Sequence, residues 1–92
     1  MRIDFSPKAI SRLENIADYI YEQTKSKKLT REYLQKMREF IITTLSIFPY
    51  AGRSCEELIS GSRKLVYQGY SIIYTVEADQ IWILTLYREN LM

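Results

Sequence analysis

The basic and aromatic side chains of the C-terminal half are the residues of this sequence best suited to binding a charged partner. Arginine binds phosphates and carboxylates through a planar fork of donors, and lysine binds them as a point charge. The candidates for such contacts are Arg53, Arg63, Lys64, Tyr87 and Arg88. Three of them also have a structural interpretation: Arg53 can fix its loop, Arg63 can pair with a carboxylate, and Lys64 can be a solvated charge at a sheet edge. The sequence alone leaves both the partner-binding and the structural interpretation open.

Other kinds of chemistry are excluded by what the sequence lacks. It has no histidine, so histidine-based triads and histidine metal sites are impossible. Cys55 is the single cysteine, which rules out an intrachain disulfide and leaves no basis for a structural zinc site. We therefore predict no metal, no cofactor and no catalytic residue that can be named with assurance.

Net charge and its distribution indicate less about function than these residue types do. The net charge of +2 is too small to argue for nucleic-acid binding by itself. Basic residues are concentrated between Lys25 and Arg38, where Glu32 is the single acid. This segment is either a patch that follows phosphates or an ordinary solvated helix surface.

Length and composition indicate one folded domain, residues 1–92, with 47% hydrophobic and 26% charged residues. No apolar run is long enough to cross a bilayer, and the N-terminus does not have the pattern of a secretory signal. We expect a cytoplasmic protein in which Cys55 is a buried, inert thiol.

Two helices are predicted to precede a sheet. A short strand, 2–5, leads to Ser6-Pro7, which can cap and begin a helix that fades near Thr24. Thr30 is expected to cap a second helix, which Pro49 ends. Both helices have an apolar face at helical spacing. The inward positions are expected to be Ile10, Leu13, Ile16, Ala17 and Ile20 in the first helix and Leu34, Met37, Ile41, Leu45 and Phe48 in the second.

Three strand-like runs lie between Gly61 and Arg88, separated by short polar or glycine-containing breaks. They predict an α+β fold in which an antiparallel helical hairpin covers one face of a small, mainly antiparallel sheet. Alternation places Tyr70, Ile72, Tyr74, Val76, Trp82, Leu84 and Leu86 toward the helices. The remaining apolar side chains would form an outward strip, which in a monomer is typical of a partner site. This predicted strip consists of Ile73, Ile81, Ile83 and Tyr87.

Several short motifs along this order of elements resemble those of a known protein family. The motifs are Ser6-Pro7, Leu45-(x)2-Phe48-Pro49-(x)2-Gly52-Arg53, Arg63, Gly69-Tyr70-(x)-Ile72-(x)-Tyr74-(x)-Val76 and Ile81-(x)-Ile83-Leu84-(x)-Leu86. Over nearly its whole length the chain resembles the ParE/RelE superfamily of type II toxin–antitoxin toxins, some of which take part in plasmid stabilisation. RelE-like members are ribosome-dependent ribonucleases that cleave mRNA, and ParE-like members poison DNA gyrase. In both groups a cognate antitoxin neutralises the toxin.

The departures from the RelE pattern favour the ParE-like activity. RelE-like enzymes have an arginine where this chain has Ser71. They also have a tyrosine and further basic residues after the last strand, and of these this chain keeps only Arg88. The resemblance therefore implies a gyrase inhibitor that is not an enzyme and forms a hetero-oligomer with an antitoxin. One alternative is an endoribonuclease acting on the ribosome and mRNA, and a second is an inactive member that only binds its antitoxin and co-regulates its operon. The outward strip is the expected antitoxin contact, and the basic and aromatic candidates are the expected target contacts.

Overall fold

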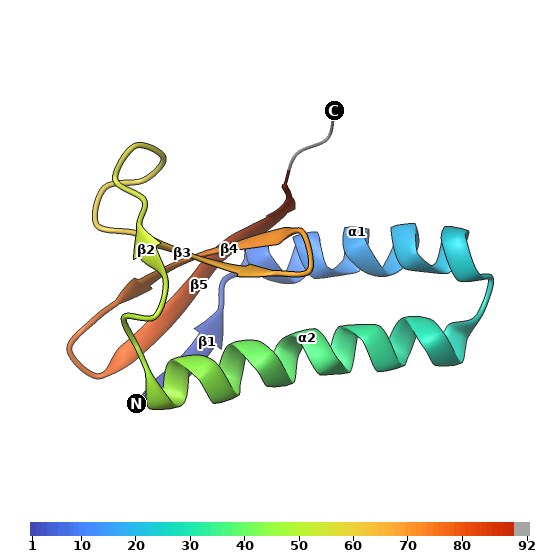
Figure 1. Ribbon diagram of the computed structural model, residues 1–92, viewed down its shortest axis with the longest axis horizontal. Helices are drawn as coiled ribbons and strands as arrows, with labels where there is room; N and C mark the ends of the chain where they lie inside the picture. The colour runs from blue at the N-terminus through green and yellow to red at the C-terminus, as the bar shows by residue number, and fades with distance from the viewer. Residues whose placement is uncertain (90–92) are drawn as a thin grey trace.

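The computed structural model, which describes residues 1–89, confirms the predicted α+β fold. Within those residues a strand is followed by two helices and four further strands (Figure 1). The two-residue strand β2 lies in a stretch that the sequence predicts to be a loop. The elements are β1 (Arg2–Phe5), α1 (Pro7–Thr24), α2 (Lys27–Ile47), β2 (Arg53–Ser54), β3 (Arg63–Tyr67), β4 (Tyr70–Val76) and β5 (Gln80–Arg88).

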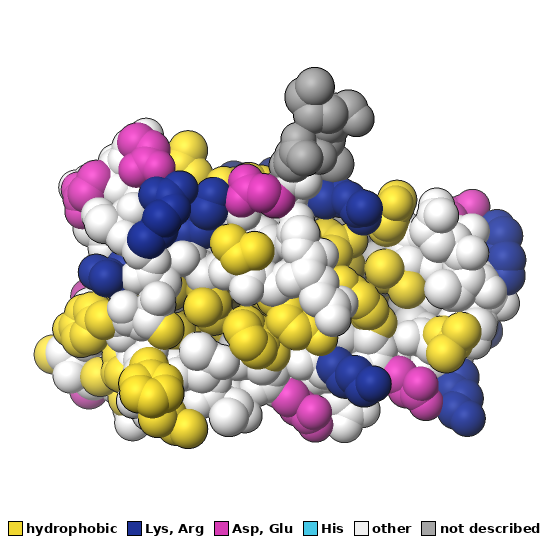
Figure 2. Space-filling view, in the orientation of Figure 1, with side chains coloured by type: hydrophobic (Ala, Val, Ile, Leu, Met, Phe, Trp, Pro, Cys, Tyr) yellow, Lys and Arg dark blue, Asp and Glu magenta, His cyan; other side chains and the backbone are white. Residues whose placement is uncertain are grey.

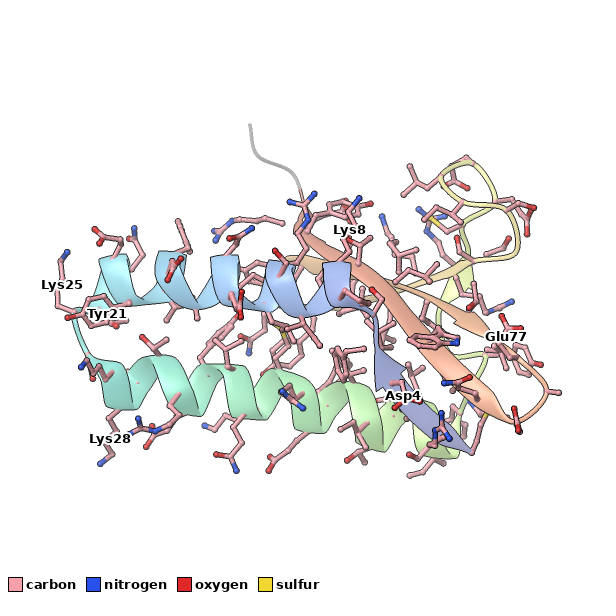
Figure 3. All side chains as sticks on the ribbon, turned by 180° about the vertical axis from the view of Figure 1, so that it is seen from behind. Asp4, Lys8, Tyr21, Lys25, Lys28 and Glu77 are labelled. Carbon is pink, nitrogen blue, oxygen red and sulfur yellow. The ribbon has the colours of Figure 1, made fainter. Side chains whose placement is uncertain are left out.

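The strands form one sheet in the order β1-β5-β4-β3-β2. All neighbouring pairs are antiparallel except β1 and β5, which are parallel and align Ile3 with Ile81. The helical hairpin lies against the sheet at one end and extends past it at the other, so that the α1–α2 connection is far from the strands (Figure 1). Figure 3 shows Tyr21, Lys25 and Lys28 at this free end of the hairpin and Asp4 and Glu77 at the opposite end of the molecule.

Serine side chains cap both helices. The Ser6 hydroxyl accepts a hydrogen bond from the Ala9 amide at 3.0 Å, as predicted for α1. α1 ends at Lys25, whose left-handed φ of 55° turns the chain. The prediction that Thr30 caps α2 was wrong, because Ser26 accepts from the Leu29 amide at 3.1 Å and α2 begins at Lys27. The connection is therefore only two residues long.

The core lies between the hairpin and one face of the sheet. Its fully or nearly buried members are Ala9, Leu13, Ile16, Met37, Ile41, Leu45, Leu65, Tyr70, Ile72, Tyr74, Ile81, Ile83 and Leu86. Two predicted inward residues, Ile10 and Phe48, are exposed instead. Ala9 takes the inward position in the first turn of α1, and Phe48 has already left the helical conformation as the C-cap of α2.

A β-bulge in β5 changes which of its residues face the core. Ile73 pairs with Thr85, but the next residue of β4, Tyr74, pairs with Ile83, so that Leu84 is an extra residue without a partner. The alternation shifts there, and Ile81, Ile83 and Leu86 all become core residues. The prediction that Ile81 and Ile83 lie on an outward strip was therefore wrong.

The start of α1 fixes this bulge. The Ser6 hydroxyl donates to the Leu84 carbonyl at 2.8 Å, and the Ser6 amide donates to the Ile83 carbonyl at 2.9 Å. Ser6 thus caps α1 and satisfies carbonyl groups of β5 that the irregular strand leaves available. The same residue links the orientation of the helix to the register of the strand.

Candidate functional site

A groove of about 470 Å³ runs between α1 and the C-terminal end of β5. Its floor includes the buried side chains of Ile16 and Leu86. Its remaining lining residues are Arg12, Asn15, Tyr19, Tyr70, Tyr87 and Arg88. An apolar floor beside two arginines can accept a chain segment that carries both apolar side chains and carboxylates.

Arg88 is placed at this groove by aromatic rings. Its guanidinium carbon lies 4.8 Å from the ring centre of Tyr19 and 5.7 Å from that of Tyr70. One guanidinium nitrogen donates to the Tyr70 hydroxyl at 3.5 Å. Among residues 1–89 no carboxylate forms an ion pair with Arg88. Ring faces orient the cation without neutralising it, so its charge remains available to a partner.

Lys64 has a different environment. Its ammonium group lies 2.7 Å from Glu89 Oε1, and its side chain is only 12% exposed. The buried Ser71 hydroxyl donates to the same oxygen. These two hydrogen bonds lower the pKa of Glu89, and the carboxylate in turn raises the pKa of Lys64. Lys64 is thus not the solvated edge charge that the sequence also allowed, but a largely buried partner of Glu89.

Arg63 holds the chain between α2 and β2. Its Nε donates to the Gly52 carbonyl at 2.7 Å, and its guanidinium lies 5.3 Å from the ring centre of Tyr50. The Tyr74 hydroxyl completes this arrangement by accepting from the Gly52 amide and donating to the Pro49 carbonyl, each at 2.9 Å. Gly52 is required here, because a Cβ atom would lie 2.6 Å from the Lys64 carbonyl oxygen.

Arg53 follows this loop as the first residue of β2. It donates to Glu57 at 3.3 Å in an ion pair whose two side chains are both more than half exposed. Such a pair contributes little to stability. Figure 2 shows Lys and Arg side chains beside Asp and Glu side chains at the end of the molecule that carries β2 and β3.

The four residues of the predicted outward strip are not together on a free surface. Ile81 and Ile83 are in the core, as described above, and Ile73 is 1% exposed on the face of the sheet away from the helices. Tyr87 is half-buried and lines the groove beside Arg88. Of the five predicted target contacts, the structure brings Tyr87 and Arg88 together at the groove.

Sequence reasoning missed the contribution of α1 to this site. Arg12 and Tyr19 are exposed residues of α1 that lie beside the groove, seven positions apart and therefore on one side of the helix. Helical spacing could have paired them with each other. Their proximity to Arg88 depends on the packing of α1 against β5, which no local pattern encodes.

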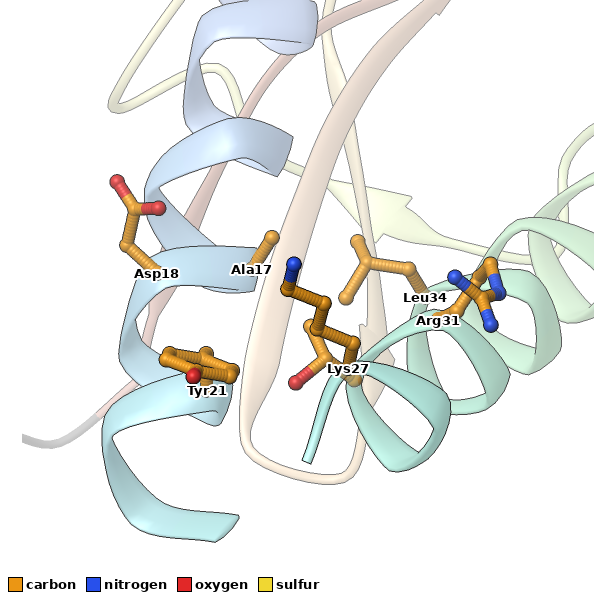
Figure 4. A pocket seen from close by; sticks show the side chains of 7 residues that line it. Ala17, Asp18, Tyr21, Lys27, Arg31 and Leu34 are labelled. Carbon is orange, nitrogen blue, oxygen red and sulfur yellow. The ribbon is translucent and has the colours of Figure 1, made fainter. Parts of the chain in front are cut away.

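A second hollow, of about 530 Å³, lies between α1 and α2 toward the free end of the hairpin. It is lined by Ala17, Asp18 and Tyr21 of α1 and by Lys27, Arg31 and Leu34 of α2, and Figure 4 shows Asp18 pointing away from α2. Lys27 and Arg31 belong to the basic segment noted in the sequence. In the part of the chain described by the structure, no group of three or more metal-binding side chains is present, and no helix is long and apolar enough to cross a membrane.

Comparison with known proteins gives a family and two similar folds. The family model for the ParE toxin of the type II toxin–antitoxin system parDE matches residues 3–89. A chain of the chromosomal ParDE toxin–antitoxin system from P. aeruginosa superposes with a TM-score of 0.79 at 22% identity, covering 98% of this chain and 97% of that one. A chain of the RelBE2 toxin–antitoxin complex from Mycobacterium tuberculosis superposes with a TM-score of 0.70 at 18% identity, covering 96% of each chain. No curated protein sequence matches significantly.

Proposed function

We propose that this chain, which belongs to the ParE family of toxins of type II toxin–antitoxin systems, stabilises the cleaved-DNA complex of DNA gyrase and is neutralised by a cognate antitoxin. A toxin of this kind acts by binding. Its target contacts must then be charged or aromatic groups that are oriented by the protein and still free to bind. The observation that carries this proposal is the pair of rings that holds Arg88 at the edge of the α1/β5 groove.

The polar groups on the other side of the sheet support binding over RNA cleavage. Cleavage of a phosphodiester needs a base for the 2′-hydroxyl and a free cation for the developing charge. Glu89 is the carboxylate nearest to Lys64, but its lowered pKa makes it a weaker base. Lys64 is already paired with Glu89, and Ser71 brings no charge.

One induction experiment distinguishes the gyrase inhibitor from the ribonuclease and from the inactive member. We expect expression of the wild-type chain to arrest growth, to damage DNA and to increase cleaved DNA in a gyrase assay with purified components. Site-specific mRNA cleavage on ribosomes, with gyrase unaffected, would contradict the proposal in favour of the ribonuclease. Neither effect, from a folded protein, would indicate an inactive member.

The contribution of Arg88 is tested against a matched arginine. Arg38 also lies over an aromatic ring, with its guanidinium 5.2 Å from the centre of Phe5, but it is outside the α1/β5 groove. We expect Arg88→Ala to lower the amount of cleaved DNA at least tenfold and Arg38→Ala to leave it unchanged. Equal effects of the two substitutions would reject Arg88 as a target contact.

For the antitoxin, we propose a segment that lies in the α1/β5 groove, with apolar side chains over Ile16 and Leu86 and carboxylates near Arg12 and Arg88. Apolar burial supplies most of the affinity, and the arginines select an acidic segment. Because Arg88 is also the proposed target contact, the bound antitoxin would cover it.

Filling the groove tests this location. Asn15 is an exposed residue that lines the groove, and Glu14 is an exposed neighbour that does not. We expect Asn15→Trp to weaken binding of the antitoxin encoded beside this gene at least tenfold in calorimetry, and Glu14→Trp to leave it unchanged. An unchanged affinity of the Asn15→Trp protein would place the antitoxin elsewhere.

A further inference from the structure

A row of aromatic rings connects α2 with Arg88 at the α1/β5 groove. Tyr33 of α2 packs edge-to-face against Tyr70 of β4, with ring centres 6.4 Å apart, and against Tyr67 of β3 at 6.3 Å. Phe40, two turns further along α2, contacts Tyr67 with ring centres 4.8 Å apart. Because the Arg88 guanidinium lies over the Tyr70 ring, the row extends from α2 across the sheet to the groove.

The main chain places Tyr70 beside Arg88 but does not orient its ring. The two residues are direct partners in the β4/β5 ladder, and the next amide, of Glu89, donates to the Gly69 carbonyl at 2.6 Å. A tyrosine ring turns about its χ2 bond in a broad energy well, so its neighbours set its orientation. That orientation matters here, because a cation is attracted to the face of an aromatic ring and not to its edge.

Tyr33 is placed to fix the orientation of the Tyr70 ring. The two rings meet at an interplanar angle of 66°, which is a favoured arrangement of aromatic pairs and is lost if either ring turns. The pKa of Tyr33 is raised, mainly by burial and also by Tyr70 and Tyr67, and the charge of Arg88 opposes this rise. The phenol of Tyr33 is therefore within electrostatic range of the guanidinium, although it belongs to a different element.

We infer that Tyr33 is a positioning residue for Arg88 and acts through the ring of Tyr70. Tyr19 of α1 and Tyr70 of the sheet contact the guanidinium, and Tyr33 holds the second of these rings from α2. Both helices of the hairpin thus contribute to the orientation of one cation at the groove. The inference rests on the proposed function only where it concerns gyrase, since the orientation of Arg88 is a property of the toxin alone.

Substitutions at Tyr33 and Phe40 separate positioning from stability. Tyr33→Phe keeps the ring that packs on Tyr70, whereas Tyr33→Ala removes it. The matched control is Phe40→Ala, which removes another half-buried ring of the same helix and the same row, but one that pairs with Tyr67. Both alanine variants should lose stability, and only Tyr33→Ala should release Arg88.

The proton resonance of the Arg88 Nε–H group measures this release, because a ring face shields a nearby proton and moves its resonance upfield. We expect Tyr33→Ala to move the resonance downfield, toward its position in the unfolded chain. Tyr33→Phe and Phe40→Ala should leave it where it is in the wild type. If Tyr33→Ala does not fold, Tyr33→Leu is measured in the same way, with the same expected result.

Two outcomes of this measurement would overturn the inference. One is an unchanged Arg88 resonance in a folded protein that lacks the Tyr33 ring. The other is an equal movement in Phe40→Ala, which would mean that any loss of packing on α2 loosens the groove.

The gyrase assay tests the same residue in the proposed function. Tyr33→Ala should lower the amount of cleaved DNA by about threefold, the factor that corresponds to losing one exposed cation–π contact. The same substitution should have no further effect in a protein that already carries Arg88→Ala, and a further fall there would overturn an action through Arg88. A resonance that moves while the amount of cleaved DNA stays the same would keep the positioning by Tyr33 and reject Arg88 as the gyrase contact.

Discussion

On the helix-covered face of the sheet, Ile72, Tyr74 and Ile83 are completely buried among aliphatic side chains, whereas on the opposite face Lys64 and Glu89 form an ion pair over Ser71. The first face is stabilised by apolar area removed from water, a contribution that does not depend on direction or pH. The second depends on a few directional, charged contacts. The comparison indicates that the covered face determines whether the chain folds, whereas charged contacts on the other face can change with a smaller effect on stability.

The largest effect is expected from a charge on the covered face. Ile83→Asp should destabilise the protein by about 4 kcal/mol or more, because it leaves a carboxylate without a partner in the core. Val66→Asp is the control, since Val66 is half exposed on the opposite face and its substitution should change stability by about 0.5 kcal/mol or less. Urea unfolding of the two variants measures the difference. Similar losses for both would show that the two faces are not distinct.

A smaller loss is expected when the covered face loses its buried hydroxyl. Tyr74→Phe keeps the ring but leaves the Gly52 amide and the Pro49 carbonyl without their partner. We expect a loss of about 1–3 kcal/mol in urea unfolding. A Tyr67→Phe variant, altered at a half-buried tyrosine of β3, serves as the comparison and should lose less. A neutral Tyr74→Phe variant would mean that water replaces the hydroxyl.

Arg88 lies at the exposed end of the helix-covered face, so its removal should affect stability less than either core change. Arg88→Ala gives up contacts with Tyr19 and Tyr70 that are worth about 0.5–1 kcal/mol at an exposed site. Calorimetric unfolding should show this small decrease beside the large loss of gyrase poisoning proposed above. A decrease as large as that of Tyr74→Phe would assign Arg88 a structural role.

The smallest effect, and the one that depends on pH, is expected at Glu89. Because its pKa is lowered from the ordinary 4.5, its contribution is present above that pH and is lost as the pH falls through the folded-state value. The raised pKa of Lys64 means that the pair also persists up to at least pH 10.5. The unfolding midpoint of Glu89→Gln should therefore be slightly below that of the wild type near pH 7, and the difference should shrink below pH 4.5. A difference that stays constant from pH 7 to pH 3 would contradict the pairing.

The sequence predicted the covered face in outline because that face follows repeating patterns. Helical spacing located Leu13, Ile16, Met37, Ile41 and Leu45 correctly, and strand alternation did the same for Tyr70, Ile72 and Tyr74. The pattern failed at Leu84, where an extra residue interrupts the alternation. That bulge depends on hydrogen bonds from Ser6, which is 78 positions away in the chain.

The candidate site was less predictable, since it depends on contacts between distant segments. Tyr87 and Arg88 were identified as candidates from their position at the end of the last strand. That Arg88 would stack on Tyr19, and that Lys64 would be paired with Glu89, could not be read from local spacing. Side chains of opposite charge are common throughout the chain, and only the sheet order selects which of them meet.

The sheet order also has a consequence for how the protein is made. β5 lies between β1 and β4, so the first strand has no partner until residues 80–88 have been synthesised. A nascent chain that has emerged only as far as β4 can form the helical hairpin, but β1 and the inner faces of the helices lack the strand that covers them. The complete sheet can therefore form only after residues 80–88 have left the ribosome.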